Sequence, residues 1–265
     1  MALWFAALLG LVQGLTEFLP ISSTAHLKIT TALLGQSDAS GAAFTAVIQL
    51  GSLAAVIVYF ARDLFIDLPR AMFKDPTSPM GRLPILIVIG SIPVVIGGLL
   101  LKRHIEGPLR SLYVIAAAMV AVGAIMWLVD NRGAGERQMT DLGYTDALLI
   151  GLAQACALVP GTSRSGATIC MCLALGMARP EAARFSFLLG IPALAGAGIF
   201  ELKGLGAIPW TPVIIATIIA FFTSLASIAW LIRWLGTHHL TPFAIYRIIA
   251  GIIIAALVLA GVVAA

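Results

Sequence analysis

Long hydrophobic stretches separated by short polar loops dominate the chain. Six of them are long enough to cross a bilayer, because a transmembrane helix needs roughly 20 mainly apolar residues. They cover residues 42–61, 84–101, 111–129, 182–201, 211–232 and 244–264. This pattern predicts an all-α integral membrane protein with six full transmembrane helices.

Two further regions, 1–34 and 144–176, each contain two short apolar pieces on either side of a polar cluster with a proline. Each piece is too short to cross a bilayer alone, so we expect helical hairpins that enter and leave on one side. Broken backbone is stable at membrane depth only where it is buried in protein or lines a wet cavity. The two regions therefore predict two re-entrant helical hairpins.

The two halves of the chain resemble each other at an offset of 140–141 residues. The aligned pairs of segments are 13–20 with 154–160 and 44–60 with 185–201. Each half then holds one hairpin and three spans, and an odd number of spans inverts the second half. The sequence thus predicts one membrane domain, 1–265, composed of a first repeat, 1–130, and an inverted second repeat, 141–265. In this plan the broken helices meet near the midplane of the bilayer.

Composition agrees with this class, since 60% of the 265 residues are hydrophobic and 11% are charged. The net charge of +4 does not indicate a nucleic-acid partner, because the basic residues lie mostly in short loops. Cytoplasmic loops are enriched in lysine and arginine, so these residues orient the chain. The side opposite the N-terminus carries ten (Arg62, Arg70, Lys74, Arg82, Arg132, Arg137, Arg179, Arg184, Arg233 and Arg247), against four on the other (Lys102, Arg103, Arg110 and Lys203). We expect the richer side to be cytoplasmic and the first hairpin to open outward.

The first polar cluster carries Glu17, and the other acidic residues lie in loops or near the ends of spans. An ionisable group at membrane depth is costly and marks a functional site, unless residues 1–17 lie at the interface and Glu17 simply faces water. Gln13 shares a helical face with Glu17 at the i, i+4 spacing. The hydroxyls and imidazole that follow are Ser22, Ser23, Thr24 and His26. Together they can supply a nucleophile and proton transfer. Spacing does not say which hydroxyl attacks, and the same serines can cap a helix over 24–34.

The second cluster, residues 160–168, has the residue types of a phosphate site. Its glycines allow close approach of the backbone, and the N–H groups of the following helix point at an anion. Ser163, Ser165 and Thr168 add hydroxyl donors, and the planar guanidinium of Arg164 matches phosphate oxygens. Arg164 needs an anionic partner, and a salt bridge to Glu17 is the alternative to phosphate. Weaker candidates elsewhere are Gln49, Gln154 and Lys28.

Both clusters resemble signatures of a known family, the bacterial undecaprenyl-diphosphate phosphatases, also called the bacitracin-resistance family. The first signature is similar to Gln13-Gly-Leu-Thr-Glu17-Phe-Leu-Pro-Ile-Ser-Ser-Thr-Ala-His26, and the second to Pro160-Gly-Thr-Ser-Arg-Ser-Gly-Ala-Thr168. The likeness covers essentially the whole chain. It implies hydrolysis of undecaprenyl diphosphate to undecaprenyl phosphate and inorganic phosphate, which recycles the lipid carrier of cell-wall synthesis and confers bacitracin resistance.

The resemblance also implies a site. Glu17, Ser23, His26 and Arg164 are the expected catalytic residues, with Ser23 as nucleophile and His26 as general base or acid. The expected substrate-binding residues are Gln13, Ser22, Thr24, Ser163, Ser165 and Thr168. A divalent cation, Mg²⁺ or Ca²⁺, is expected, with Glu17 as its candidate ligand. The expected location is the bacterial inner membrane with the site facing outward, and the expected partners are the polyprenyl diphosphate, membrane lipids and a possible second copy of the chain.

Two alternatives stay open from the residues alone. Glu17 or His26 could activate water directly instead of Ser23. An inverted repeat with broken helices is also the plan of transporters, so a polyprenyl-phosphate transporter or flippase is the rival function. Transport needs no nucleophile, and the set of Glu17, Ser23 and His26 favours hydrolysis.

Overall fold

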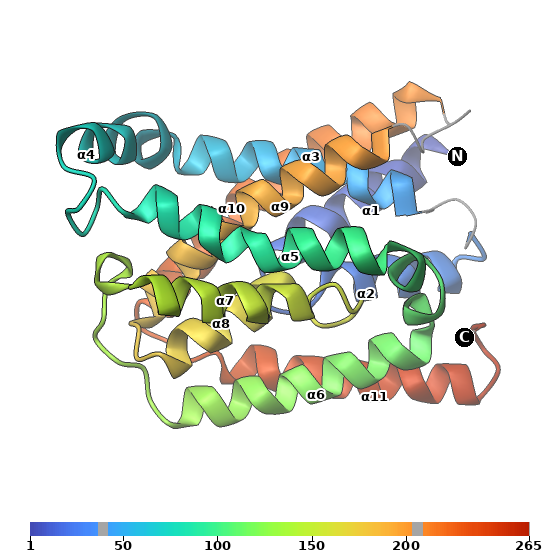
Figure 1. The fold of residues 1–265 in the computed structure, drawn as a ribbon. Helices are drawn as coiled ribbons and strands as arrows, with labels where there is room; N and C mark the ends of the chain where they lie inside the picture. Colours follow the sequence, from blue (N-terminus) through green and yellow to red (C-terminus); the bar gives the residue numbers. More distant parts are fainter. Residues whose placement is uncertain (37–41, 203–208, 265) are drawn as a thin grey trace.

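The computed structural model describes residues 1–36, 42–202 and 209–264. The regular elements of these parts are helices, shown in Figure 1. They are α1 (Leu3–Glu17), α2 (Ser23–Leu33), α3 (Ala42–Tyr59), α4 (Leu68–Lys74), α5 (Leu83–Glu106), α6 (Leu112–Asn131), α7 (Tyr144–Cys156), α8 (Arg164–Ala174), α9 (Arg179–Glu201), α10 (Trp210–Leu235) and α11 (Thr241–Leu259).

Five of the described helices, α5, α6, α9, α10 and α11, are long and apolar enough to cross a membrane. The bent pair formed by α3 and residues 63–74 gives a sixth if it counts as one span. Large apolar side chains remain exposed on the outside of the bundle, such as Val88, Phe222 and Leu259. Because a lipid environment, unlike water, accommodates such a surface, we describe the chain as a multi-pass membrane protein.

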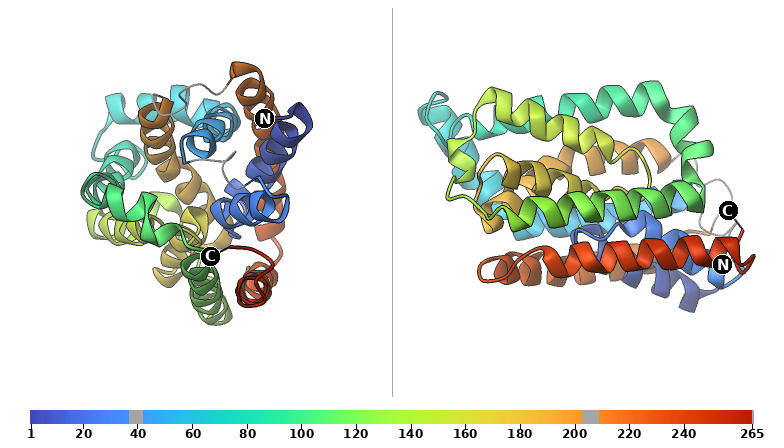
Figure 2. Two further views of the ribbon diagram at one scale, coloured as in Figure 1. Left: turned by 90° about the vertical axis from the view of Figure 1, so that its right-hand side faces the viewer. Right: turned by 90° about the horizontal axis from the view of Figure 1, so that it is seen from below.

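The two pairs of short helices, α1 with α2 and α7 with α8, approach the centre of the molecule from opposite ends (Figure 1). In Figure 1 both termini lie at the right-hand end, and α4 lies at the left-hand end with the connection from α6 to α7. The connection from α1 to α2 and that from α7 to α8 both lie near the middle. Two long helices, α6 and α11, pack side by side along one edge of the molecule (Figures 1 and 2).

Small residues allow the short helices to approach their long neighbours closely. A Cβ atom added at Gly151 of α7 would lie 2.5 Å from the carbonyl oxygen of Gly90 in α5. At Gly10 of α1 it would lie 2.3 Å from the carbonyl oxygen of Ala216 in α10. Close contacts at small residues are typical of helix packing in membranes. The arrangement holds α1 against α10 and α7 against α5.

The structure corrects one residue of the charge count. Arg247 lies within α11, is fully buried and contacts both central connections, so it is not one of the loop charges of the richer side. Lys203 lies outside the described residues. Without Arg247 and Lys203, the end of the molecule that carries α4 still has more basic residues than the opposite end.

Candidate active site

The two central connections have the same local structure. Ser22 and Ser163 precede α2 and α8, and their side chains accept hydrogen bonds from the backbone N–H groups of Ala25 and Gly166. Both have positive φ values, 74° and 68°, and they are the non-glycine residues with positive φ in the described parts of the chain. Such backbone is costly and tends to occur at functional sites. The expected capping role is thus confirmed for Ser22.

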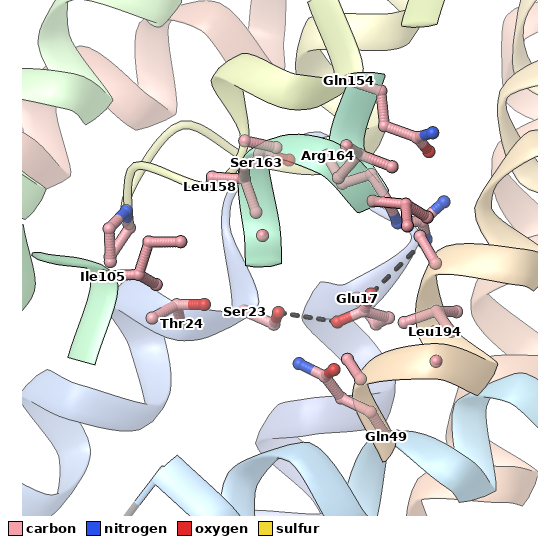
Figure 3. Close-up of a pocket in the computed structure, with 18 of the residues that line it drawn as sticks. Glu17, Ser23, Thr24, Gln49, Ile105, Gln154, Leu158, Ser163, Arg164 and Leu194 are labelled. Atoms are coloured by element: carbon pink, nitrogen blue, oxygen red, sulfur yellow. Dashed lines mark hydrogen bonds and ion pairs between the residues drawn. The ribbon is translucent and has the colours of Figure 1, made fainter. Parts of the chain in front are cut away.

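Glu17 ends α1 and connects the two clusters. Its Oε2 accepts hydrogen bonds from the hydroxyl of Ser23 at 2.7 Å and from the amide of Gln13 at 2.9 Å. Its Oε1 lies 3.4 Å from Nη2 of Arg164. Figure 3 shows the carboxylate between the serine and the arginine. The carboxylate and hydroxyl of the first cluster therefore meet the guanidinium of the second, and the salt bridge considered as an alternative is present.

Arg164 is held by packing as well as by charge. Its guanidinium lies over the ring of Phe18, 5.9 Å from the centroid, and Nη1 donates to the carbonyl of Ser186 at 3.4 Å. A Cβ atom at Gly190 of α9 would lie 1.6 Å from Nη1, so only glycine leaves room for this rotamer. These contacts direct the arginine at Glu17 and at the cavity.

A cavity of about 680 Å³ lies over this group. Its polar lining comes mainly from the two connections (Glu17, Ser22, Ser23, Thr24, Ser163 and Arg164), with Gln49 of α3 beside them. Its apolar lining includes Val95 and Leu99 of α5, Leu158, and Leu194 and Phe200 of α9. A site with a polar end and apolar walls suits a ligand that has an anionic head and a hydrocarbon tail.

Three predicted binding residues do not line this cavity. Gln13 lies behind Glu17 and is fully buried. Ser165 lies 3.2 Å from the hydroxyl of Ser163 and donates to the carbonyl of Leu19 at 3.3 Å. The hydroxyl of Thr168 lies 2.8 Å from the carbonyl of Arg164 and 2.5 Å from the hydroxyl of Ser186. These side chains support the residues at the cavity, and their direct contact with phosphate stays a prediction.

His26 is close to the cavity in sequence but faces α11. Its Nδ1 lies 2.7 Å from the carbonyl of Ser22, and its Nε2 lies 2.6 Å from the hydroxyl of Tyr246. A carbonyl can only accept, so Nδ1 carries the proton and Nε2 of the neutral ring accepts from Tyr246. The imidazole thus fixes the carbonyl of Ser22, while Glu17 is the hydrogen-bond partner of Ser23.

The cavity offers oxygen ligands of the kind that Mg²⁺ and Ca²⁺ use. The described parts of the chain contain no group of three or more His, Cys, Asp or Glu side chains that could hold a metal ion. Glu17 supplies a carboxylate, and Oε1 of Gln13 is buried without a hydrogen-bond partner among the described residues. Mg²⁺ is commonly bound through one or two carboxylates with substrate phosphates and water. Glu17 therefore fits the expected cation as its protein ligand at the cavity, with further ligands coming from the substrate, and Gln13 lies directly behind it.

Sequence reasoning missed the position of Arg247, which is fully buried beside the two central connections. This arginine donates hydrogen bonds to backbone carbonyls of both central connections. Its signal was present in the sequence, because it lies inside the predicted span 244–264 and has no acidic neighbour there.

Comparisons with known proteins agree with the geometry. The model of the family described as Bacitracin resistance protein BacA matches residues 6–253. A protein of Myxococcus xanthus named undecaprenyl-diphosphatase is 46% identical, over 98% of this chain and 91% of its own length. Proteins with the same name from Kineococcus radiotolerans and a Nocardioides species are 47% and 44% identical, covering 96% and 98% of this chain and 93% and 98% of their own lengths. The chain belongs to the bacitracin resistance protein BacA family.

Proposed function

We propose that this chain hydrolyses undecaprenyl diphosphate to undecaprenyl phosphate and inorganic phosphate. The observation that carries the proposal is the carboxylate of Glu17, which accepts a hydrogen bond from Ser23 and pairs with Arg164. The proposed nucleophile Ser23, its base Glu17 and the phosphate-binding guanidinium of Arg164 thereby meet at one end of an apolar cavity. In the cell this reaction recycles the carrier of cell-wall synthesis, and resistance to bacitracin follows from it.

Ser23 and Glu17 have the relation of a nucleophile and its general base. In the proposed first step, Oγ of Ser23 attacks the terminal phosphorus and Glu17 takes the hydroxyl proton. The bond from that phosphorus to the bridging oxygen breaks, and undecaprenyl phosphate leaves. Water then attacks the phosphoserine and releases inorganic phosphate. Activation of water by Glu17 without a covalent intermediate is the competing scheme.

Arg164 and Ser163 bind the phosphates in this scheme. The guanidinium exchanges Glu17 for phosphate oxygens when the substrate enters, because a doubly charged phosphate is the stronger partner for a planar fork of donors. Ser22 and Thr24 line the same polar end. A bound divalent cation would neutralise part of the diphosphate charge, with Glu17 as its protein ligand at the cavity. The role of His26 as acid or base stays a prediction, since its ring nitrogens contact Ser22 and Tyr246.

The matching connections support an inverted repeat with two re-entrant hairpins. Ser22 and Ser163 stand at the repeat offset, 141 residues apart, and share cap and backbone geometry. The packing of α1 against α10 corresponds to that of α7 against α5. We place the protein in the bacterial inner membrane with α4 on the cytoplasmic side, which opens the first hairpin outward. A homodimer remains a prediction.

Trapping of the intermediate tests the chemistry directly. Wild-type protein quenched during turnover with a substrate radiolabelled at the terminal phosphate is expected to carry label on Ser23, located by mass spectrometry. Ser23→Ala is expected to lose phosphate release by about 100-fold or more and to trap no label. A Ser23→Ala protein with near-wild-type release would refute the serine scheme.

Wild-type protein that binds the lipid without releasing phosphate would point to the rival function. Transport of polyprenyl phosphate requires capture of the anion but no bond cleavage. A liposome assay of lipid flipping would then be decisive, and Ser23→Ala would be expected to flip as well as wild type.

A further inference from the structure

Arg247 is a buried cation that makes no contact with the cavity described above. It lies within the first two turns of α11, and none of its surface is exposed. In the described parts of the chain its guanidinium donates to backbone carbonyls and has no carboxylate within ion-pair distance. An isolated buried charge is costly. The hydrogen bonds to these carbonyls offset that cost, so the buried guanidinium favours the arrangement in which the carbonyls can accept them.

The carbonyls that accept from Arg247 belong to both central connections. Nη1 donates to Pro20 at 3.1 Å, and Nη2 donates to Gly161 and to Thr162 at 2.8 Å each. These residues lie between helices, where carbonyls lack the regular intrahelical partners. One planar guanidinium therefore bridges the connection between α1 and α2 and the connection between α7 and α8.

The residues of the proposed chemistry flank these carbonyls. Pro20 lies three residues after Glu17 and three before Ser23, and Thr162 lies two before Arg164. The spacing between the carboxylate and Arg164 thus depends on how the two connections are placed relative to each other. A misplacement of about 1 Å in such a set can lower the rate by about 100-fold.

We infer that Arg247 is a positioning residue, which fixes the two connections in the relative placement that brings Glu17 and Ser23 to Arg164. The inference rests on the proposed phosphatase function. Arg247 acts through backbone carbonyls and does not touch the substrate. Lysine cannot replace it fully, because a single ammonium group lacks the forked geometry that reaches both connections.

Steady-state kinetics of Arg247→Met and Arg247→Lys test this role. Arg247→Met is expected to lower kcat by about 100-fold with KM within about threefold, since the walls that hold the lipid are unchanged. Arg247→Lys is expected to have a kcat about tenfold higher than that of Arg247→Met. A kcat of Arg247→Met near wild type, or a raised KM at unchanged kcat, would overturn the inference.

Arg179→Met is the matched control for general damage. Arg179 is also a mostly buried arginine. Its Nε donates to the carboxylate of Asp130, at the end of α6, at 2.7 Å, and its Nη2 donates to the backbone carbonyl of the same residue. This variant is expected to lower the melting temperature about as much as Arg247→Met while keeping kcat within about threefold of wild type. An equal loss of kcat in both variants would reduce Arg247 to a structural residue.

A distance measurement separates this inference from the proposed function. Spin labels at Leu33, at the end of α2, and Tyr144, at the start of α7, report the separation of the two hairpins, with the three native cysteines replaced. Arg247→Met is expected to broaden or shift the distance distribution, whereas Arg179→Met is not. An unchanged distribution in Arg247→Met would contradict the inference even if hydrolysis is lost. A changed distribution in a protein whose wild type releases no phosphate would uphold the bridging and reject the phosphatase.

Discussion

At the scale of single residues, Glu17 is the centre of the site. Gln13, Ser23 and Arg164 all direct polar hydrogens at its two oxygens. A buried ion pair is weak evidence for stability, because removal of two charges from water offsets most of their attraction. In the proposed mechanism this pair is a resting arrangement, in which the carboxylate accepts a hydrogen bond from the hydroxyl that it would activate.

Gly190 provides a test of how closely Arg164 must be placed. Gly190→Ala puts a methyl group where Nη1 of Arg164 lies, so the guanidinium must leave Glu17. Phosphate release is expected to fall by about 100-fold. Gly143→Ala, where an added Cβ would lie 3.8 Å from Oδ2 of Asp146, is the control and should stay close to wild type. Full activity of Gly190→Ala would show that the observed rotamer of Arg164 is not the working one.

Residue types were predictable from the sequence, but side-chain directions were only partly so. The pairing of Glu17 with Arg164 follows from the need of each buried charge for a partner. Ser165 and Thr168 carry suitable hydroxyls but lie on the side of α8 that faces Leu19 and Ser186. Arg247 was counted with the loops, because a charge near a predicted helix end can equally face water. The packing of α11 on the two connections decides this, and no local pattern encodes it.

At the scale of elements, the two breaks are more informative than the long spans. Each break ends a short helix, sets a serine at positive φ and begins the next helix with that serine as its cap. The strain of such backbone, about 1–3 kcal/mol per residue, persists only where the surroundings determine it. We attribute it to the placement of Ser23 and Arg164 directly after the caps.

Substitution of the capping serines tests this attribution. Ser22→Ala and Ser163→Ala lose the cap and keep the strain, and each is expected to lower the unfolding free energy by about 1 kcal/mol more than the matching glycine variant. The melting temperatures of the alanine and glycine variants in detergent test this difference in stability. Ser111 caps α6 with φ of −62°, so its alanine and glycine variants should differ less. Equal melting of the alanine and glycine variants at Ser22 and Ser163 would argue against strain.

Most helix boundaries follow from the hydrophobic pattern, and the exceptions have physical reasons. The last helix ends at Leu259 and not at residue 264, because the chain turns at Gly261, where φ is +69°. The polar segment after α3 is helical where a loop was expected, and residues 63–74 form with α3 a pair bent by 66°. Its mixed charged and apolar residues resemble a loop in a hydropathy pattern.

At the scale of the whole molecule, different elements form the polar end of the cavity and the apolar walls that would hold the lipid tail. The polar end of the cavity belongs mainly to the short helices and their connections, and its apolar walls belong largely to the long helices α5 and α9. A diphosphate carries several negative charges, and Arg164 compensates only part of them. This imbalance is the physical reason to expect a divalent cation.

Removal of the cation is therefore expected to stop turnover. EDTA should lower phosphate release by about tenfold or more, and Mg²⁺ or Ca²⁺ should restore it. A rise in melting temperature on addition of the cation, weaker in Glu17→Gln, provides a second measure that does not depend on catalysis. Release that is insensitive to EDTA, with no cation-dependent melting, would remove the cation from the account.

The central claim is that one carboxylate from the first half and one arginine from the second form a single hydrolytic site. The most direct measurement is phosphate release from undecaprenyl diphosphate by wild type, Glu17→Gln, Arg164→Met and the double variant, with melting temperature as the check on folding. We predict that each single change lowers kcat/KM by about 100-fold or more and that the double variant loses little beyond the worse single one, because groups that act as a unit are not additive. Losses that multiply in the double variant, or a folded wild type without phosphate release, would contradict the account.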